Sequence, residues 1–352
     1  MVDRQGRDEV IEEHVAIQGV CAWPNLQRLP DGSLVVLVFN QPCHGLWEGD
    51  LDCWASEDEG RTWRFRGRAA EHEPGTNRMN CAAGLAKDGD LVVICGGWSD
   101  RGPVGQPSWG PRRVLRPWVC RSADGGRTWQ VRKEFPDPPS GARVKAEAFI
   151  CFGNIVPGAD GSLRVAAYLR KDGGRECYLL RSVDDGRTWG QPVILNPVGN
   201  ETCVLHLGGG RWLASSRELA ENKTANIVLC TSEDDGLTWQ RRGPVTLANQ
   251  VTSHLMRLRD GRVLLSYGNR NWGNFGVDVR LSDDEGRSWG GPIRIAGARW
   301  ADCGYPSSVQ LADGRVVTAY YTKVSHDFHY EMRVAVWRPE DFATTGRPIA
   351  ER

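Results

Sequence analysis

The sequence lacks most of what helical, membrane-spanning and metal-binding proteins need. No apolar run is long enough to cross a membrane, and no segment of useful length shows the helical period. The 11 cysteines form no CxxC pair, and no cluster of metal-ligating residues is visible. The formal net charge is 0, from 44 Lys+Arg against 44 Asp+Glu, so the basic excess that nucleic acid or a membrane surface requires is missing. We expect no nucleic-acid or membrane partner, no cofactor and no required metal.

The cysteines and the first residues bear on the compartment. An odd number of cysteines cannot all pair within one chain, and Cys151 and Cys230 lie in apolar runs, where a thiol behaves as a small buried hydrophobe. Residues 1–9 are polar and lack the apolar core of a signal peptide. We expect a reduced, cytoplasmic protein.

What the sequence has in excess is turn-forming residues and tryptophan. It contains 42 Gly and 19 Pro, and its 15 Trp outnumber its 8 Phe. So many turn formers are untypical of a helical protein. A length of 352 residues would allow two domains, but one large β-architecture over 1–352 accounts for it equally well.

One octet recurs five times and accounts for at least five of the tryptophans. It follows the pattern Ser-x-Asp-x-Gly-x-Thr/Ser-Trp and begins at Ser56, Ser122, Ser182, Ser232 and Ser282. The Asp side chain can accept hydrogen bonds from backbone N–H groups of a turn, Gly can supply a left-handed residue, and Trp can pack beneath. Each octet therefore predicts a self-tied hairpin turn, with a structural rather than a catalytic Asp.

A second turn recurs once per unit, in front of an apolar run of four to six residues. Its copies are Asp31-Gly32, Asp88-Gly89, Asp160-Gly161, Gly209-Gly210, Asp260-Gly261 and Asp313-Gly314. Asp-Gly is a strong hairpin marker, and the runs that follow are rich in Val, Leu and aromatic residues, which is typical of strands. Each unit is predicted as strand, turn, strand, loop, strand, octet turn, strand.

Six such units predict an all-β fold, a six-bladed β-propeller with four antiparallel strands per blade. The blades are expected at approximately 20–68, 78–136, 146–196, 200–247, 251–296 and 303–338. The sixth unit has no octet, and an N-terminal strand at 10–17 is expected to complete it and close the ring.

The octets resemble the Asp-boxes, or BNR repeats, of the sialidase superfamily, and the whole chain looks like one sialidase-type propeller domain. That resemblance implies a central site with three arginines, a Tyr/Glu nucleophile pair and an Asp acid/base. The segment from Glu201 to Arg217 is similar to the family segment that a Glu opens and an Arg closes. Tyr305-Pro-Ser-Ser resembles the segment opened by the nucleophilic Tyr, and Tyr267-Gly-Asn-Arg270 the segment carrying another arginine.

The chemistry of this set is coherent. A sialic acid carries its carboxylate on the anomeric carbon and repels a carboxylate nucleophile, whereas a neutral Tyr avoids that repulsion. Glu201 can take the proton of Tyr305, while Arg217 and Arg270 stabilise the phenolate. A planar guanidinium also binds both oxygens of a substrate carboxylate.

One position departs from the family pattern. The first sialidase blade opens with an Arg, but Cys21-Ala22-Trp23-Pro24 places Ala22 there. Arg78, before the second-blade strand, and Arg170, at the end of a third-blade strand, are the candidates to replace it. The sugar bound can therefore differ from a sialic acid.

The resemblance places the acid/base in the loop over 40–50, where Asp50 is the first candidate and Glu48 the second. His44 in the same loop is a further proton carrier. Glu147 and His254 point toward the site by position, and a structural role for both is an equal alternative.

Three functions remain open. The first is a retaining, sialidase-like exo-glycoside hydrolase acting on a terminal acidic sugar of a glycan. The second is a lyase on the same propeller, in which Tyr305 or His254 abstracts the proton beside a uronate that an Arg neutralises. The third is a carbohydrate-binding or scaffold propeller without catalysis. The sugar, the linkage and the oligomeric state are not set by the sequence.

Overall fold

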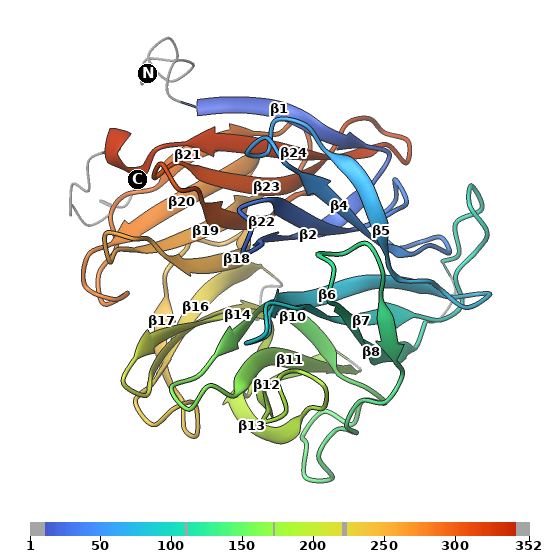
Figure 1. The fold of residues 1–352 in the computed structure, drawn as a ribbon, viewed down its shortest axis with the longest axis horizontal. Coiled ribbons are helices and arrows are strands. Elements are labelled where there is room, and N and C mark those ends of the chain that lie inside the picture. Colours follow the sequence, from blue (N-terminus) through green and yellow to red (C-terminus); the bar gives the residue numbers. More distant parts are fainter. Residues whose placement is uncertain (1–10, 110–111, 172, 220–223, 343–352) are drawn as a thin grey trace.

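The computed structural model describes residues 11–109, 112–171, 173–219 and 224–342, without the side chains of Ala22 and Lys171 (Figure 1). Within these ranges the chain forms 24 strands and one turn of 3-10 helix, η1 (Pro339–Asp341). None of the described segments is a helix with the length and apolar character needed to cross a membrane.

The strands fall into six groups of four. The first two groups are β2 (Cys21–Arg28), β3 (Leu34–Phe39), β4 (Leu51–Ser56) and β5 (Arg64–Ala70), then β6 (Asn77–Leu85), β7 (Leu91–Trp98), β8 (Val114–Ser122) and β9 (Gln130–Arg132). The next two are β10 (Ile150–Pro157), β11 (Leu163–Lys171), β12 (Gly174–Ser182) and β13 (Gly190–Asn196), then β14 (Gly199–Gly208), β15 (Arg211–Leu219), β16 (Ala225–Ser232) and β17 (Gln240–Pro244). The fifth is β18 (Gln250–Arg257), β19 (Val263–Asn269), β20 (Gly276–Ser282) and β21 (Ile293–Gly297). The sixth joins β22 (Cys303–Gln310), β23 (Val316–Lys323) and β24 (Tyr330–Trp337) to β1 (Ile11–Gln18).

Neighbouring strands within each group are antiparallel, and the groups surround a common centre. Figure 1 shows the first long strand of every group nearest that centre, namely β2, β6, β10, β14, β18 and β22. The fold is therefore all-β and propeller-like.

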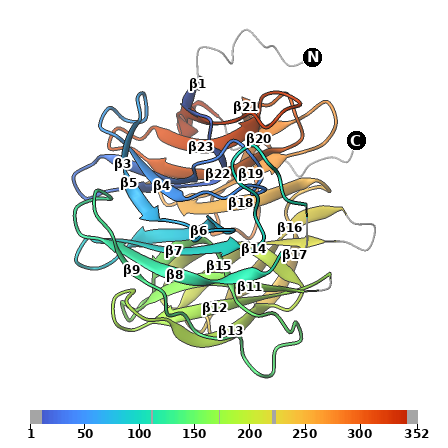
Figure 2. The same ribbon diagram turned by 90° about the vertical axis from the view of Figure 1, so that its right-hand side faces the viewer.

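The N-terminal strand pairs with the end of the chain. β1 runs antiparallel to β24, from Ile11 opposite Trp337 to Gln18 opposite Glu331. Both Figure 1 and the side view in Figure 2 place β1 beside the strands of the sixth group. Val10, the first residue of the strand expected at 10–17, lies outside the described residues. The pairing covers the edge of β24 that would otherwise be open.

The sheets number five in the described residues, not the six separate blades expected. The second and third groups share one eight-stranded sheet, because β6 and β10 pair in parallel at Ala82–Gly153 and Ala83–Asn154. Small side chains permit this approach: a Cβ on Gly84 would lie 2.2 Å from the carbonyl oxygen of Ile155. No turn signal in the sequence marks this join, because the join depends on how closely the two inner strands pack side by side.

The octets form the expected self-tied turns. In the first, Asp58 accepts hydrogen bonds from the Thr62 N–H (2.8 Å) and the Ser56 hydroxyl (2.8 Å), and the Trp63 indole donates to Gly60 O (3.0 Å). The octet glycine has φ of +92° at Gly60, a left-handed conformation that glycine adopts without strain. The other four octets repeat these bonds, so their Asp side chains are structural.

The apolar core lies between neighbouring groups of strands. β3, β7 and β19 are buried along their whole length, which explains why their sequences are nearly continuous apolar runs. All 11 cysteines are buried and unpaired in the structure.

The inner strands carry the feature that positions the site. The register of each one shifts near the centre, and the backbone is left-handed at Trp23 (φ +62°), Gly153 (+78°), Thr252 (+58°) and Tyr305 (+50°). Such bulges turn a side chain away from its ordinary alternation and are frequent beside active sites.

Candidate active site

Three of the predicted site residues form one hydrogen-bonded cluster at the centre. Tyr305 on β22 donates its hydroxyl proton to Glu201 Oε1 on β14 at 2.5 Å. Arg217 on β15 donates from Nη1 to Glu201 Oε2 at 2.6 Å and lies 3.4 Å from the Tyr305 oxygen. Three strands from two groups thus bring together a phenol, a carboxylate and a guanidinium.

The charges of this cluster set its protonation. Burial would raise the pKa of Glu201, but the charge of Arg217 and the hydrogen bond from Tyr305 lower it overall. Burial and the neighbouring Glu201 raise the pKa of Tyr305, while Arg217 and Arg270 act in the opposite direction. At rest the phenol is neutral, and an ionised carboxylate is in contact with its proton.

Arg270, which directly follows β19, is the fourth predicted residue near Tyr305. Its guanidinium lies 5.6 Å from the centre of the Tyr305 ring. It donates from Nε to Cys303 O (3.1 Å) and from Nη2 to the Tyr321 hydroxyl (3.0 Å). The four residues Tyr305, Glu201, Arg217 and Arg270 therefore lie together, as the sequence analysis expected of their positions.

Aromatic rings surround Tyr305. The rings of Trp23, Phe152 and Tyr321 have centroids 5.6, 5.8 and 5.7 Å from its own. Trp23 follows Ala22, the position where the resemblance expects an arginine; the side chain of Ala22 lies outside the described residues. The aromatic wall excludes water around the phenol and lowers the local dielectric.

Arg270 lines a cavity of about 640 Å³, whose wall carries more cations than anions. The side chains that line it include His44, Arg101, Arg112, Arg270, Asp302, Lys323 and Tyr330. Arg101 is buried and donates to backbone carbonyls of Ser99, Gly45 and Ser108. In the described part of the chain, Arg101, Arg112 and Lys323 have no ion-pair partner. Uncompensated positive charge in a hollow of this size suits an anionic ligand.

A second cavity of about 360 Å³ adjoins the first, since Arg112 lines both. Arg170 and Glu147, two of the predicted residues, line it together with Trp98. The guanidinium carbons of Arg112 and Arg170 lie 4.7 and 5.9 Å from the Trp98 ring centre. Of the two residues considered as replacements for the missing arginine, Arg170 is the one that reaches this hollow.

Arg78 lies elsewhere. It is buried on β6, with its guanidinium carbon 3.6 Å from the Trp118 ring centre and Nη1 donating to Arg116 O at 3.0 Å. It lines neither of the two cavities. Its Nη2 also lies 3.7 Å from Glu73 Oε2, so its contacts are those of a packing residue.

The two carboxylates proposed as acid/base are held by other partners. Asp50 is buried and contacts Arg68 Nη1 (3.0 Å), His72 Nδ1 (2.6 Å) and the Asn40 amide (3.2 Å). Glu48 accepts a hydrogen bond from the Gly75 N–H. Neither contacts Tyr305 or lines the cavity, so the structure does not bring them together with the central cluster.

His254 does not line the cavity of about 640 Å³. His254 and Tyr305 both line a narrow void of about 20 Å³, room for about one water. His254 Nε2 is 2.9 Å from the Asn154 amide nitrogen, and burial lowers the pKa of His254 to about 4. The ring is therefore neutral at ordinary pH.

Asp302 is a residue of the site that sequence reasoning missed. It lies just before β22 and accepts hydrogen bonds from the hydroxyls of Tyr321 (2.5 Å) and Tyr330 (2.6 Å). His44 Nδ1 is 3.1 Å from Oδ2, the oxygen that accepts from Tyr330, and Arg270 Nη2 is 3.8 Å from Oδ1, the oxygen that accepts from Tyr321. The one signal was its position three residues before Tyr305.

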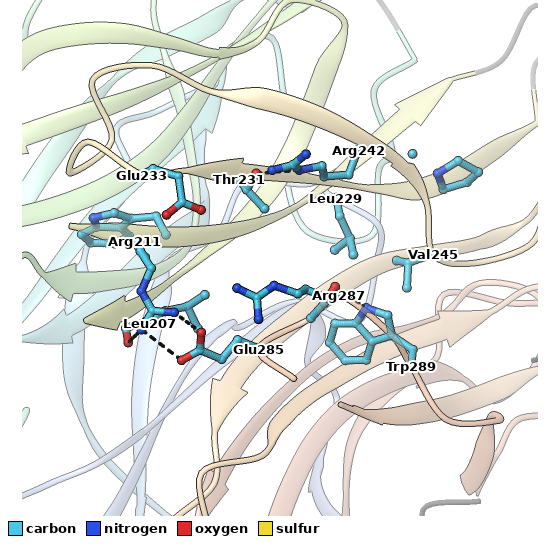
Figure 3. A pocket seen from close by; sticks show the side chains of 14 residues that line it. Leu207, Arg211, Leu229, Thr231, Glu233, Arg242, Val245, Glu285, Arg287 and Trp289 are labelled. Carbon is cyan, nitrogen blue, oxygen red and sulfur yellow. Dashed lines mark hydrogen bonds and ion pairs between the residues drawn. The ribbon is translucent and has the colours of Figure 1, made fainter. Parts of the chain in front are cut away.

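Another hollow, of about 480 Å³, lies between the fourth and fifth groups of strands. Figure 3 shows Arg287 between Glu285 and Trp289 on one side and Arg242 and Glu233 on the other. None of the predicted site residues lines it. No three His, Cys, Asp or Glu side chains gather as metal ligands in the ranges that the structure covers.

Comparison with known structures defines the class of fold. The structure resembles a protein of unknown function from Dyadobacter fermentans, with a TM-score of 0.77 at 24% identity, over 94% of this chain and 98% of that one. It also resembles the Hadza microbial sialidase Hz136 (TM-score 0.68, 20% identity, 91% and 66% of the two chains). The NanB sialidase of Streptococcus pneumoniae is similar with a TM-score of 0.71 at 12% identity, over 97% and 73%. The fold is that of the sialidases.

The family follows from the sequence. The profile of the family described as "BNR repeat-like domain" matches residues 101–318, more than half of the chain, and the chain belongs to that family. No curated protein matches the sequence.

Proposed function

We propose that the protein is a sialidase-like exo-glycoside hydrolase that removes a terminal acidic sugar from a glycan with retention of configuration. The observation that carries the proposal is the Tyr305–Glu201–Arg217 cluster, in which the phenolic oxygen donates a hydrogen bond to a carboxylate oxygen 2.5 Å away. The proposal includes a six-bladed propeller, with the two groups joined at β6–β10 counted as separate blades, and a cytoplasmic location.

The cluster supports Tyr305 as nucleophile. Glu201 takes the phenolic proton as the Tyr305 oxygen attacks the anomeric carbon, and Arg217 and Arg270 stabilise the phenolate as it forms. A neutral nucleophile is needed if the anomeric carbon carries a carboxylate, because a second carboxylate would be repelled. Water then releases the sugar from Tyr305.

The charge of the cavity supports an acidic sugar. Arg270 provides one guanidinium beside Tyr305, and Arg101, Arg112 and Lys323 line the same cavity without ion-pair partners among the described residues. These cations act in place of the arginine absent at Ala22, and Arg170 extends the positive surface into the adjoining hollow. The resemblance offers Asp50 first and Glu48 second as the acid/base, but each is held by partners outside the central cluster.

The test is hydrolysis of fluorogenic 4-methylumbelliferyl glycosides of acidic sugars, sialic acids first. Tyr305→Phe is expected to lower kcat at least about 100-fold, because the nucleophile is lost. Tyr178→Phe is the matched control: Tyr178 is also buried and donates to a carboxylate, Glu176, at 2.7 Å, but lies away from the cavity. Turnover that survives in Tyr305→Phe would exclude the Tyr nucleophile.

A lyase is the second candidate, and the uncompensated cations of the cavity favour it as much as they favour an acidic hydrolase substrate. In that reaction Tyr305, as its phenolate, or His254 removes the proton beside a uronate, and Arg270 neutralises the carboxylate. Uronate-containing oligosaccharides then give an unsaturated product that absorbs in the ultraviolet, without release of fluorophore from the glycosides. Glycan binding with neither product would point to a non-catalytic propeller.

A further inference from the structure

Asp302 is the centre of a polar cluster at the edge of the large cavity. Tyr321 and Tyr330 donate to its two oxygens, His44 Nδ1 lies 3.1 Å from Oδ2, and Arg270 lies 3.8 Å from Oδ1. Burial would raise the pKa of Asp302, but the hydrogen bond and charge of His44 and the charge of Arg270 lower it well below its usual range. The carboxylate is therefore ionised and only accepts hydrogen bonds.

This fixes how His44 is protonated. Because Asp302 can only accept, His44 Nδ1 must carry a hydrogen, and Nε2 is the atom that gains and loses a proton. Nε2 has no hydrogen-bond partner in the described part of the chain, and the His44 side chain, 40% exposed, lines the cavity. The arrangement is an imidazole oriented by a carboxylate, with its reactive nitrogen open to a ligand.

His44 and Tyr305 share two aromatic neighbours. Its ring contacts Trp23 edge-on (4.9 Å between centroids) and Tyr321 (6.4 Å), and both of those rings also contact Tyr305. His44 and Tyr305 are therefore held against the same two aromatic side chains. Asp50, by contrast, shares no contact with this group and is paired with Arg68 and His72.

We propose that His44 is the proton donor to the leaving group and that Asp302 is its positioning residue; this rests on the proposed function. In the first step, imidazolium Nε2 gives its proton to the glycosidic oxygen. The bond from that oxygen to the anomeric carbon breaks with its electron pair moving to the oxygen, and the Tyr305 oxygen bonds to the carbon. In the second step neutral Nε2 takes a proton from water, whose oxygen attacks the same carbon and displaces Tyr305, and Glu201 returns the phenolic proton.

The proposal makes the rate depend on pH, with a sign set by the donor. The donor must be protonated, so the rate falls at a pH high enough to remove its proton. Removing the negative charge of Asp302 favours the neutral imidazole, so the fall moves to lower pH in Asp302→Asn. Among the described residues, the charged and titratable groups that line the cavity with His44 or contact its ring are Asp302, Arg270, Arg101, Arg112, Lys323, Tyr321 and Tyr330.

The experiment compares two leaving groups on the acidic sugar whose 4-methylumbelliferyl glycoside the wild-type protein cleaves. Methylumbelliferone leaves without help from an acid, whereas the alcohol of the corresponding methyl glycoside needs protonation. His44→Gln is expected to lower kcat/KM for the methyl glycoside by roughly 10²- to 10⁴-fold and for the aryl glycoside far less. It is also expected to remove the fall of the rate at high pH.

His72→Gln is the matched control, since His72 Nδ1 also contacts an aspartate, Asp50, at 2.6 Å, but outside the cavity. Equal losses on both leaving groups, or a larger leaving-group dependence in Asp50→Asn than in His44→Gln, would overturn the role of His44. If Asp302→Asn leaves the pH profile of the methyl glycoside unmoved, Asp302 is not its positioning residue. A wild-type protein that cleaves no glycoside overturns the proposed function itself, which is a different result from a change in His44→Gln.

Discussion

Asp302 and Tyr305 lie three residues apart and serve two different clusters, because the backbone bends sharply between them. Gly304 (φ +105°) and Tyr305 (φ +50°) are both left-handed, and a Cβ on Gly304 would lie 2.8 Å from Gly268 Cα. Tyr305 bonds to Glu201, whereas Asp302 bonds to Tyr321 and Tyr330. A left-handed tyrosine carries backbone strain, which the surrounding rings and hydrogen bonds must hold.

The ionised state of Asp302 predicts how stability depends on pH. The pKa of Asp302 in the folded protein is lower than the value of about 3.9 in an unfolded chain. The ionised carboxylate therefore adds fully to the free energy of unfolding above about pH 3.9, and this addition is lost as pH falls toward the folded-state pKa. We expect Asp302→Asn to destabilise the protein at pH 7 and the difference from wild type to shrink as pH falls below about 4. Urea unfolding of both proteins between pH 7 and pH 3 measures this, and a constant difference would contradict it.

At the scale of residues, the sequence predicted side chains at strand ends that recur in every group. It did not predict contacts between side chains that are far apart in the chain. Tyr305, Glu201, Arg217 and Arg270 were found because equivalent strand ends converge at the centre of a ring. The contact between His44 and Asp302 joins residues 258 apart in the chain, and no local pattern marks it. Arg78 was expected just before an inner strand; it lies within β6, where the Trp118 ring stacks with its guanidinium.

At the scale of elements, the pairing of the second and third groups requires a residue without a side chain at Gly84. β6 and β10 approach so closely at Gly84 that any side chain there would meet the Ile155 backbone, which cannot move aside as a flexible side chain can. Phe149 and Ile155 in β10 and the segment before it pack in the same core cluster as Ala82 of β6. A displaced β10 would therefore disturb more than the parallel bridge.

We expect Gly84→Ala to lower the free energy of unfolding by about 1–3 kcal/mol, since the added methyl overpacks a closed contact. Gly141→Ala is the control, because nothing lies within 4 Å of a Cβ there and its φ is not left-handed. Chemical denaturation of the two variants compares them. Equal stabilities would show that the two groups can move apart without cost.

Turns and strands were predictable because their signals are local. The octets encode their own hydrogen bonds, as between Asp124 and Thr128, within five residues. Sheet-to-sheet contacts are not encoded in this way, since they depend on which small residues face each other. That is why the number of strands per group followed from the sequence and the eight-stranded sheet did not.

For the whole molecule, a net charge of zero conceals an uneven distribution. Cations without ion-pair partners in the described residues gather at the large cavity, while many other arginines pair with carboxylates near the octet turns, as Arg121 does with Asp88 and Asp90. Positive charge without carboxylate partners among the described residues therefore lines this cavity.

We expect this positive charge to make substrate binding sensitive to salt. For an acidic glycoside, KM should rise as ionic strength increases from about 0.01 to 1 M, over which the Debye length falls from about 30 to 3 Å. Screening about 1 kcal/mol of attraction corresponds to a rise of about fivefold, with kcat little changed. Steady-state kinetics with the methyl ester of the same glycoside, which is uncharged, serves as control; equal salt effects on both would contradict a carboxylate-binding role for the cavity.

The pairing of β1 with β24 has a consequence for how the protein forms. Ile11 at the start of β1 pairs with Trp337 at the end of β24, so the sixth sheet cannot be completed until β24 has been synthesised. Contacts this distant in sequence make folding slow, because a long loop must close first. Until β24 is available, the backbone N–H and C=O groups of β1 lack their strand partner. Newly synthesised chains can associate through such unpaired groups.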